Sequence, residues 1–451
     1  MSGDLFGPIF APDAFREAVS GKAWLQAMLD AEAALAVAEA RAGLIPAEAA
    51  EAIVRLCDAD LFDVGEIGDR GRAAGNPVPA LARALTGEVS KTSEDAARHV
   101  HRGATSQDIT DTAAMLVSRR TLGLILVEMD GIAGACARLA EEHRGTLMAG
   151  RTLLQQALPT TFGLKAAGWL VSVLEARRRL RAVRDSGLAA QLGGAAGTLA
   201  SLGDSGLPVL REFALELGLA EPAVPWHTDR TRVSNLGDAL SLLAGVLAKI
   251  SQDIILMAQT EIGEVAEPSG EGRGGSSTLP HKRNPILSVT AAANARRVQD
   301  LGRTLQAAMA QEHERAAGAW HSEWEALSEA LALAGGAAAN VREATAGLEV
   351  HPEKMRENLG ATKGMLLAEN VTTVASEKLG RLKAHDLVEA ACRRALADGK
   401  HLREELLQDR RIREALSEGE IDAALEPAGY LGSAGAFVDR ALKLYREEEH
   451  S

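Results

Sequence analysis

The feature that most restricts the fold of this chain is the spacing of apolar side chains between Ser234 and Val265. Apolar residues recur there at intervals of three and four positions, at Leu243, Val246, Leu247, Ile250, Ile254 and Met257. Such spacing places them on one face of an α-helix, as in the seam of a helix bundle. Aromatic residues make up 3% of the chain and hydrophobic residues 46%, so the core must consist mainly of small aliphatic side chains. The sequence therefore predicts an all-α protein.

Further helices are expected on both sides of this segment. Ser20 is placed to cap a helix from about Lys22 to Ala42. Residues 286 to about 316 are expected to form another helix, about 45 Å long at a rise of 1.5 Å per residue. We interpret the chain as a helical domain over 1–112, a central elongated bundle of long helices over 113–350, and a smaller helical domain over 351–451.

The charge balance restricts the partners of this chain. Acidic residues outnumber basic ones by 62 to 49, which gives a formal net charge of −13. A surface of this sign repels nucleic acid and anionic membranes, so we expect neither as a partner. A small anionic substrate would need a local cluster of cations.

The cysteines are few and widely separated. Cys57, Cys136 and Cys392 show neither a C-x-x-C spacing nor the cysteine and histidine spacing of metal ligands. We expect buried thiols in a reducing compartment. The first residues lack the basic and apolar regions of a secretory leader, and no apolar run is long enough to span a membrane. The sequence predicts a cytoplasmic protein without metal or cofactor.

The segment 270–285 has the most distinctive composition. Its sequence, G-E-G-R-G-G-S-S-T-L-P-H-K-R-N-P, combines a glycine-rich start with the cationic run 281–283. Glycine keeps a segment loose, and the cations can meet an anion, so we predict a lid that orders over a bound anion. A solvated linker between two helices is the alternative. The start also fits G-x-G-x-x-G, but no strand pattern precedes it, which argues against a Rossmann site.

The string G-S-S-T-L-P-H-K-R-N-P resembles the signature loop of the fumarase/aspartase superfamily, the all-helical enzymes that eliminate a group β to a carboxylate. The resemblance covers nearly the whole chain and implies a homotetramer whose sites combine three separated regions from different subunits. It implies that Ser276 transfers the proton α to the carboxylate. His281 and Lys282 are the other catalytic candidates, and Asn284 is a candidate for substrate binding.

The stretch H-R-G-A-T-S-Q-D at 101–108 resembles the first active-site region of this superfamily. The resemblance implies that four of its side chains bind substrate carboxylates, namely His101, Thr105, Ser106 and Gln107. Without the family, the hydroxyl and carboxyl groups of residues 110–112 could be N-caps for the helix that follows.

A second region, G-R-T-L-L-Q at 150–155, resembles the G-R-T-H-x-Q turn of the superfamily. This resemblance implies that Arg151, Thr152 and Gln155 bind substrate. Leu153, however, stands where most relatives carry the histidine that serves as general acid.

Two further strings resemble the cycloisomerase branch of the superfamily. They are P-W-H-T-D-R at 225–230 and E-H-E-R-A-A-G-A-W-H-S-E-W at 312–324. The first implies that His227 and Arg230 line the substrate site. From the residues alone, the first could be a cluster at the start of a helix without chemical role. The second could be charge pairs and packed indoles at a helix junction.

The cycloisomerase branch lactonises 3-carboxy-cis,cis-muconate in protocatechuate (β-ketoadipate) catabolism, so the resemblance implies a small anionic polycarboxylate substrate. One alternative is an elimination of the adenylosuccinate or argininosuccinate type, and another is a structural homologue without turnover. Leu153 disfavours the first, because a basic amine needs a general acid in order to leave, whereas a carboxylate with a pKa of about 4 does not. The intact signature loop disfavours the second.

Overall fold

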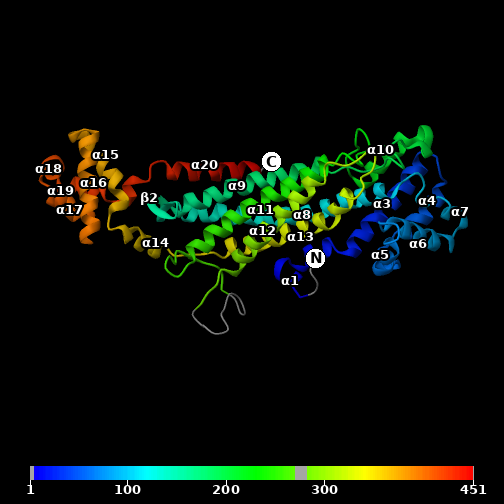
Figure 1. The fold of residues 1–451 in the computed structure, drawn as a ribbon, viewed down its shortest axis with the longest axis horizontal. Helices are drawn as coiled ribbons and strands as arrows, with labels where there is room; N and C mark the ends of the chain where they lie inside the picture. The colour runs from blue at the N-terminus through cyan, green and yellow to red at the C-terminus, as the bar shows by residue number, and fades with distance from the viewer. Residues whose placement is uncertain (1–4, 270–281, 450–451) are drawn as a thin grey trace. The chain divides into compact units, whose positions relative to one another are not determined.

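The computed structural model describes residues 5–269 and 282–449, and it is built almost entirely of helices (Figure 1). The N-terminal helices are α1 (Gly7–Phe10), α2 (Asp13–Ala18), α3 (Gly21–Arg41), α4 (Ala47–Val54), α5 (Val64–Gly71), α6 (Val78–Ser90) and α7 (Glu94–Ala97). The next helices are α8 (Ser106–Glu142), α9 (Phe162–Ala182), α10 (Gly206–Leu217), α11 (Thr231–Met257), α12 (Ile286–Ala307) and α13 (Ala319–Ala346). The C-terminal helices are α14 (Pro352–Leu359), α15 (Ala368–Leu379), α16 (Arg381–Asp398), α17 (Leu402–Gln408), α18 (Arg410–Ala415), α19 (Glu418–Ala424) and α20 (Ala434–Glu449). The all-α prediction is confirmed.

The strands described by the structure are short. Strands β1 (Leu147–Thr152) and β2 (Gln155–Thr161) form an antiparallel hairpin, and β3 (Val265–Ala266) pairs with β4 (Glu349–Val350). The structure also has short segments of other helix types: η1 (Ala59–Leu61), η2 (Val183–Gly187), η3 (Ala200–Ser205), η4 (Gly360–Thr362), η5 (Met365–Leu367) and η6 (Pro427–Tyr430).

The chain divides into two compact units. The first contains Met1–Asp130, Glu175–Lys249 and Thr290–Val341, and the second contains Gly131–Leu174, Ile250–Val289 and Arg342–Ser451. The boundary predicted at residue 112 falls inside α8, which starts at Ser106. The division into three domains stays a prediction.

Residues 107–118 of helix α8 lie in the first unit and are buried on every side of the helix. Its fully buried residues include Ile109, Ala113, Met115, Val117 and Leu122. A helix that is apolar on all sides is stable only when other elements surround it.

Helices α11 and α12 approach each other closely within the first unit. A Cβ atom at Gly302 would lie 2.2 Å from Ser241 Oγ, and one at Gly237 would lie 3.1 Å from Leu305 Cδ1. Small residues on both helices therefore permit a contact that larger side chains would prevent. This packing suits a core with few aromatic residues.

The structure corrects several predicted boundaries. Ser20 caps α3 as predicted, by accepting a hydrogen bond from Ala23 N. The helix predicted over 286–316 ends at Ala307, which makes it about 33 Å long. Residues 308–318 form an irregular connection instead, in which His313 and Gly318 have positive φ.

Among the described residues, α11 alone is long and apolar enough to cross a membrane by length and composition. Within its apolar window, 44% is buried inside the chain. Core helices of soluble proteins meet the same criterion.

Candidate active site

Helix α8 starts from a cap formed by Thr105 and Asp108. Asp108 N donates to the Thr105 carbonyl oxygen at 3.0 Å, and Thr105 N donates to Asp108 Oδ2 at 2.9 Å. This contact is one half of a capping box, in which the carboxylate of the third helical residue accepts a hydrogen bond from the backbone N–H of the N-cap residue. The N-cap role predicted for residues 110–112 is wrong, because they lie inside the helix and Thr110 Oγ1 donates to the Ser106 carbonyl oxygen.

The buried Asp108 carboxylate joins three segments that are far apart in the sequence. In addition to its contact with Thr105, it accepts hydrogen bonds from Gly193 N and Gly194 N, both at 2.9 Å. His227 Nε2 lies 2.7 Å from Asp108 Oδ1. Gly194 has a φ of +68°, a conformation that glycine adopts without strain. Asp108 thus fixes the glycine turn and His227 against the first turn of α8.

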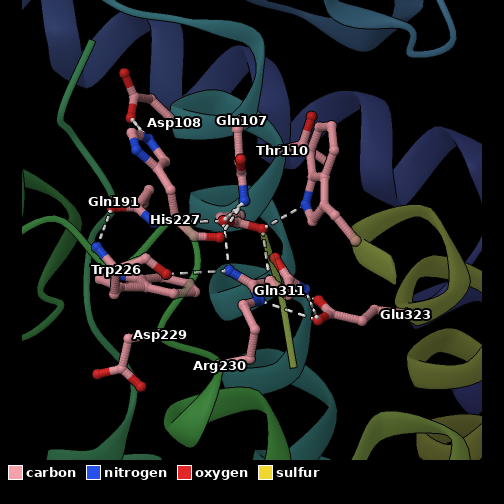
Figure 2. A network of polar contacts seen from close by, with 12 residues as sticks. Gln107, Asp108, Thr110, Gln191, Trp226, His227, Asp229, Arg230, Gln311 and Glu323 are labelled. Atoms are coloured by element: carbon pink, nitrogen blue, oxygen red, sulfur yellow. Dashed lines mark hydrogen bonds and ion pairs between the residues drawn. The ribbon is translucent and has the colours of Figure 1, made fainter. Parts of the chain in front are cut away.

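Arg230 lies at the centre of a buried ionic network (Figure 2). Its Nη1 and Nη2 donate to the two oxygens of Asp111 at 2.8 and 3.0 Å. Its Nε and Nη2 donate to Glu323 at 3.0 and 2.5 Å, and Nη1 also donates to the Trp226 carbonyl oxygen at 3.4 Å. All five N–H groups of the guanidinium therefore have partners within the chain.

The environment of Arg230 stabilises its charge. Burial alone would lower the pKa of its guanidinium, but Asp111 and Glu323 together raise that pKa above its usual value. Burial raises the pKa of Glu323, and Arg230 offsets part of this shift. A buried pair of this kind is costly to break, because removal of one partner leaves an uncompensated charge.

Gln107 belongs to the same network. Its Nε2 donates to Asp111 Oδ2 at 3.1 Å and to the His227 carbonyl oxygen at 2.8 Å, and its Oε1 accepts from Arg315 Nε at 3.2 Å. Trp320 Nε1 and Gln191 Nε2 also donate to Asp111, at 2.9 and 3.4 Å. The contacts of Gln107, His227 and Arg230 are therefore internal. Their predicted contact with substrate stays a prediction, and this geometry does not favour it.

The outer edge of this network is accessible. His101, Thr105 and Ser106 are half-buried, and Arg315 Nη1 donates to Thr105 Oγ1 at 3.1 Å. Ser106 is the first residue of α8, which has 37 residues. The N-terminus of a long helix favours an anion, and the hydroxyl groups and Arg315 add donors at the same place. This edge suits a carboxylate.

The second unit contains the hairpin region. Arg151, at the end of β1, makes a bidentate ion pair with the fully buried Glu264 at 2.6 and 2.9 Å. Asn358 Nδ2 donates to the same carboxylate at 2.9 Å. Arg151 is thus held by an internal partner, whereas Thr152 and Gln155 are exposed and face each other across the hairpin.

The tip of the hairpin is apolar and strained. Leu153 and Leu154 have φ values of 51° and 66° and are 97% and 77% exposed. Leucine rarely adopts this left-handed conformation. The aliphatic side chain of Leu153 cannot donate a proton, as the sequence already implied.

The structure describes only part of the signature loop. Ser276 and His281 lie outside the described residues, as does most of the predicted lid. Lys282 is exposed, and Arg283 pairs with Glu349 at 2.9 Å, a contact that raises the pKa of Arg283. Asn284 lies two residues before α12.

Sequence reasoning missed the acidic partners of the predicted cations. Asp108, Asp111, Glu264 and Glu323 were not selected as site residues, although each one is buried against a predicted site residue. One signal was present: Asp108 stands three residues after Thr105, the spacing of a capping box. Glu323 lies within the string at 312–324 that resembles the cycloisomerase branch, which was a second signal. For Glu264 the sequence carries no local signal.

The described residues contain no group of three or more histidine, cysteine, aspartate or glutamate side chains that could hold a metal ion. The prediction of a site without metal stays a prediction.

Comparison with known proteins identifies the family. Residues 10–300 match the family described as "Lyase", and residues 364–441 match "Adenylosuccinate lyase C-terminus". The chain belongs to the fumarase/aspartase superfamily. The resemblance predicted from the signature loop of this superfamily is therefore confirmed.

Several members of the superfamily are similar over nearly their whole length. A 3-carboxy-cis,cis-muconate cycloisomerase of Bradyrhizobium diazoefficiens is 46% identical and covers 97% of each chain. A nitrosuccinate lyase of Streptomyces davaonensis is 45% identical over 98% of this chain and 95% of its own. The crystal structure of the 3-carboxy-cis,cis-muconate lactonizing enzyme from Pseudomonas putida has a TM-score of 0.94 and 42% identity, and the match covers 99% of each chain.

Proposed function

We propose that this protein is a cycloisomerase that lactonises 3-carboxy-cis,cis-muconate. The observation that carries the proposal is the apolar, exposed Leu153 at the hairpin position where the superfamily places a general acid. In the reverse reaction the leaving group is a carboxylate, which is stable as an anion without a proton. The 46% identity to a cycloisomerase over 97% of both chains supports the same reaction.

The reaction needs no co-reactant. A carboxylate oxygen of the substrate forms a bond to a carbon of the double bond, and the electron pair moves into the conjugated carboxylate. A proton then adds at the carbon α to that carboxylate, which gives the lactone. The barrier depends on the transient dianionic group, so fixed donors lower it most. We assign this stabilisation to Lys282, Asn284, Thr105 and Ser106, and the proton transfer to Ser276.

A second candidate is elimination of nitrite from nitrosuccinate. The 45% identity to a nitrosuccinate lyase motivates it. Nitrite is also the anion of a moderately strong acid, so it can leave without a general acid. Leu153 is therefore compatible with both reactions, and it disfavours release of a basic amine or hydroxide.

The test is a panel of substrates with the purified enzyme. Loss of the ultraviolet absorbance of the conjugated diene in 3-carboxymuconate is the expected result, with no cleavage of adenylosuccinate, argininosuccinate, malate or aspartate. Lys282→Ala and Ser276→Ala should each lower turnover at least about a hundredfold, while Lys443→Ala, an exposed control, should not. Turnover of nitrosuccinate alone would select the second candidate. Efficient cleavage of any of the other four would contradict both.

We also propose that the protein acts as a cytoplasmic homotetramer on a small polycarboxylate. The apolar helix α11, whose Leu242 is 48% exposed, supports assembly, because a further chain could cover such residues. Sedimentation should give a tetramer. An active monomer would contradict this proposal.

A further inference from the structure

Helix α3 carries two buried glutamates that the proposed reaction does not use. Glu32 and Glu39 are seven residues apart, which places them two turns apart on one face of the helix. Glu32 Oε1 lies 2.6 Å from His101 Nδ1. Both carboxylate oxygens of Glu39 are buried without a hydrogen-bond partner among the described residues.

His101 is held in an unusual position by this contact. Its φ is 58°, a left-handed conformation that is uncommon for residues other than glycine. The Nδ1 atom of His101 is hydrogen-bonded to Glu32, and the described part of the chain provides no hydrogen-bond partner for its Nε2 atom. The Glu32 side chain is 1% exposed and that of His101 is 22% exposed. The ring is therefore anchored on its buried side and open on the other.

The charges around His101 come from two helices and a neighbouring residue. Glu32 and Glu39 face it from α3, Asp108 faces it from α8, and Arg102 is adjacent in the chain. Burial lowers the pKa of His101, but the hydrogen bond and the charge of Glu32, together with the charges of Asp108 and Glu39, outweigh this effect, so the pKa is raised. Burial raises the pKa of Glu39 to about 8, which leaves Glu39 uncharged at neutral pH. Glu32 is therefore the carboxylate on α3 that can control the charge of His101.

We propose that Glu32 is a positioning residue that holds His101 as an imidazolium, with its Nε2–H group directed at a carboxylate of the substrate. The inference rests on the proposed function in one respect, because it assumes that His101 binds a carboxylate group of a polycarboxylate substrate. Glu32 fixes which nitrogen faces outward and supplies the negative charge that keeps the ring protonated. A neutral imidazole would bind an anion more weakly.

The test is Glu32→Gln, which keeps the shape of the side chain and removes its charge. An opposite charge in contact shifts a pKa by about one to three units, so the alkaline limb of kcat/KM should move at least about one pH unit toward acid. At pH 8, KM should rise about tenfold while kcat changes less than about threefold. The difference in KM between the two proteins should shrink as the pH falls, because the ring then becomes protonated in both.

Glu39→Gln is the matched control, because it replaces a carboxylic acid that is already neutral on the same face of α3. Below pH 7 the dependence of kcat/KM on pH should be the same for Glu39→Gln as for the parent enzyme. If Glu32→Gln gave the same profile as Glu39→Gln, the inference would be wrong.

A second measurement separates this inference from the proposed function. The ionisation of His101 can be followed by NMR of ¹³C-labelled histidine, with His101→Gln used to assign the signal. The binding of tricarballylate, a saturated tricarboxylate, can be followed by calorimetry across the same pH range. The NMR titration and the calorimetry do not require turnover. Failure to lactonise muconates would therefore overturn the proposed function and leave this inference to be tested.

These readouts also cover a variant that fails to fold. If Glu32→Gln is unfolded, a pKa of His101 above 6.5 in the parent enzyme supports the inference, and a pKa below 6.5 overturns it. Glu32→Asp, which keeps the charge, should retain most of the parent profile. A profile shifted as far as that of Glu32→Gln would show that packing, and not charge, is what Glu32 provides.

Discussion

The buried network around Arg230 and the hairpin tip at Leu153 differ in how far their polar groups are satisfied. Arg230 has partners for all five N–H groups within its own unit. The hairpin presents exposed Thr152, Leu153 and Gln155, whereas Arg151 is tied to the buried Glu264. Both regions match motifs of one superfamily. A motif match therefore combines residues that maintain the fold with residues that are free to meet a ligand.

The largest expected effect lies in the network. Arg230→Met would leave Asp111 and Glu323 buried without their cation, which costs about 3–5 kcal/mol of unfolding free energy. Arg410→Met is the control, because the Arg410 side chain is 85% exposed and its ion pair with Glu414 is worth about 1 kcal/mol or less. Urea unfolding measures both. Equal losses in the two variants would show that the network does not stabilise the fold.

The next largest effect is on the pH dependence of stability, and it concerns another buried ionisable group, Glu39. Glu39 has a folded pKa of about 8, above its ordinary value of 4.5. Its contribution to stability is therefore largest below pH 4.5 and is lost as the pH rises toward 8. Glu39→Gln should remove this loss and increase unfolding free energy by about 1–3 kcal/mol at pH 8. A gain of equal size at pH 5 and pH 8 would contradict this account.

A smaller effect is expected at the exposed hairpin. Thr152→Val and Gln155→Leu should each lower kcat/KM about tenfold through loss of one hydrogen bond to substrate. The melting temperature should stay the same, since both side chains are exposed. If either variant instead lowered the melting temperature and kept full activity, the contrast between the two regions would fail at that residue.

The smallest effect tests strain at the hairpin tip. Leu154 has a φ of 66°, so Leu154→Gly should relieve strain and stabilise the chain by about 0.5–1 kcal/mol. Chemical unfolding of the variant beside the parent measures this gain. A loss of stability would mean that the exposed leucine contributes to packing in the assembled protein.

The helices were predictable because their apolar spacing is a local property of the sequence. The seam on α11 and the cap at Ser20 required no knowledge of distant residues. The hairpin was harder to predict, since Leu153-Leu154 carries neither glycine nor asparagine, the residues that usually indicate such a turn.

The orientation of the site residues was not predictable for a different reason. Arg230 and Asp111 are 119 residues apart, and no spacing rule links them. The motif identified Arg230 as a candidate, but only the fold shows that its donors are used internally. Thr105 and Ser106 could be predicted better, because they stand directly at the start of a helix.

The exposed tip of the hairpin also bears on how this scaffold could acquire new activities. Substitutions at Leu153 and Leu154 alter no buried contact within the chain, since both side chains are largely in solvent. Most changes at an active site are limited by the stability that they sacrifice. Here a lineage could replace an acid by an aliphatic residue, or the reverse, with little effect on folding. The catalytic repertoire of such a scaffold can therefore diversify through single exposed positions while its buried framework stays under separate selection.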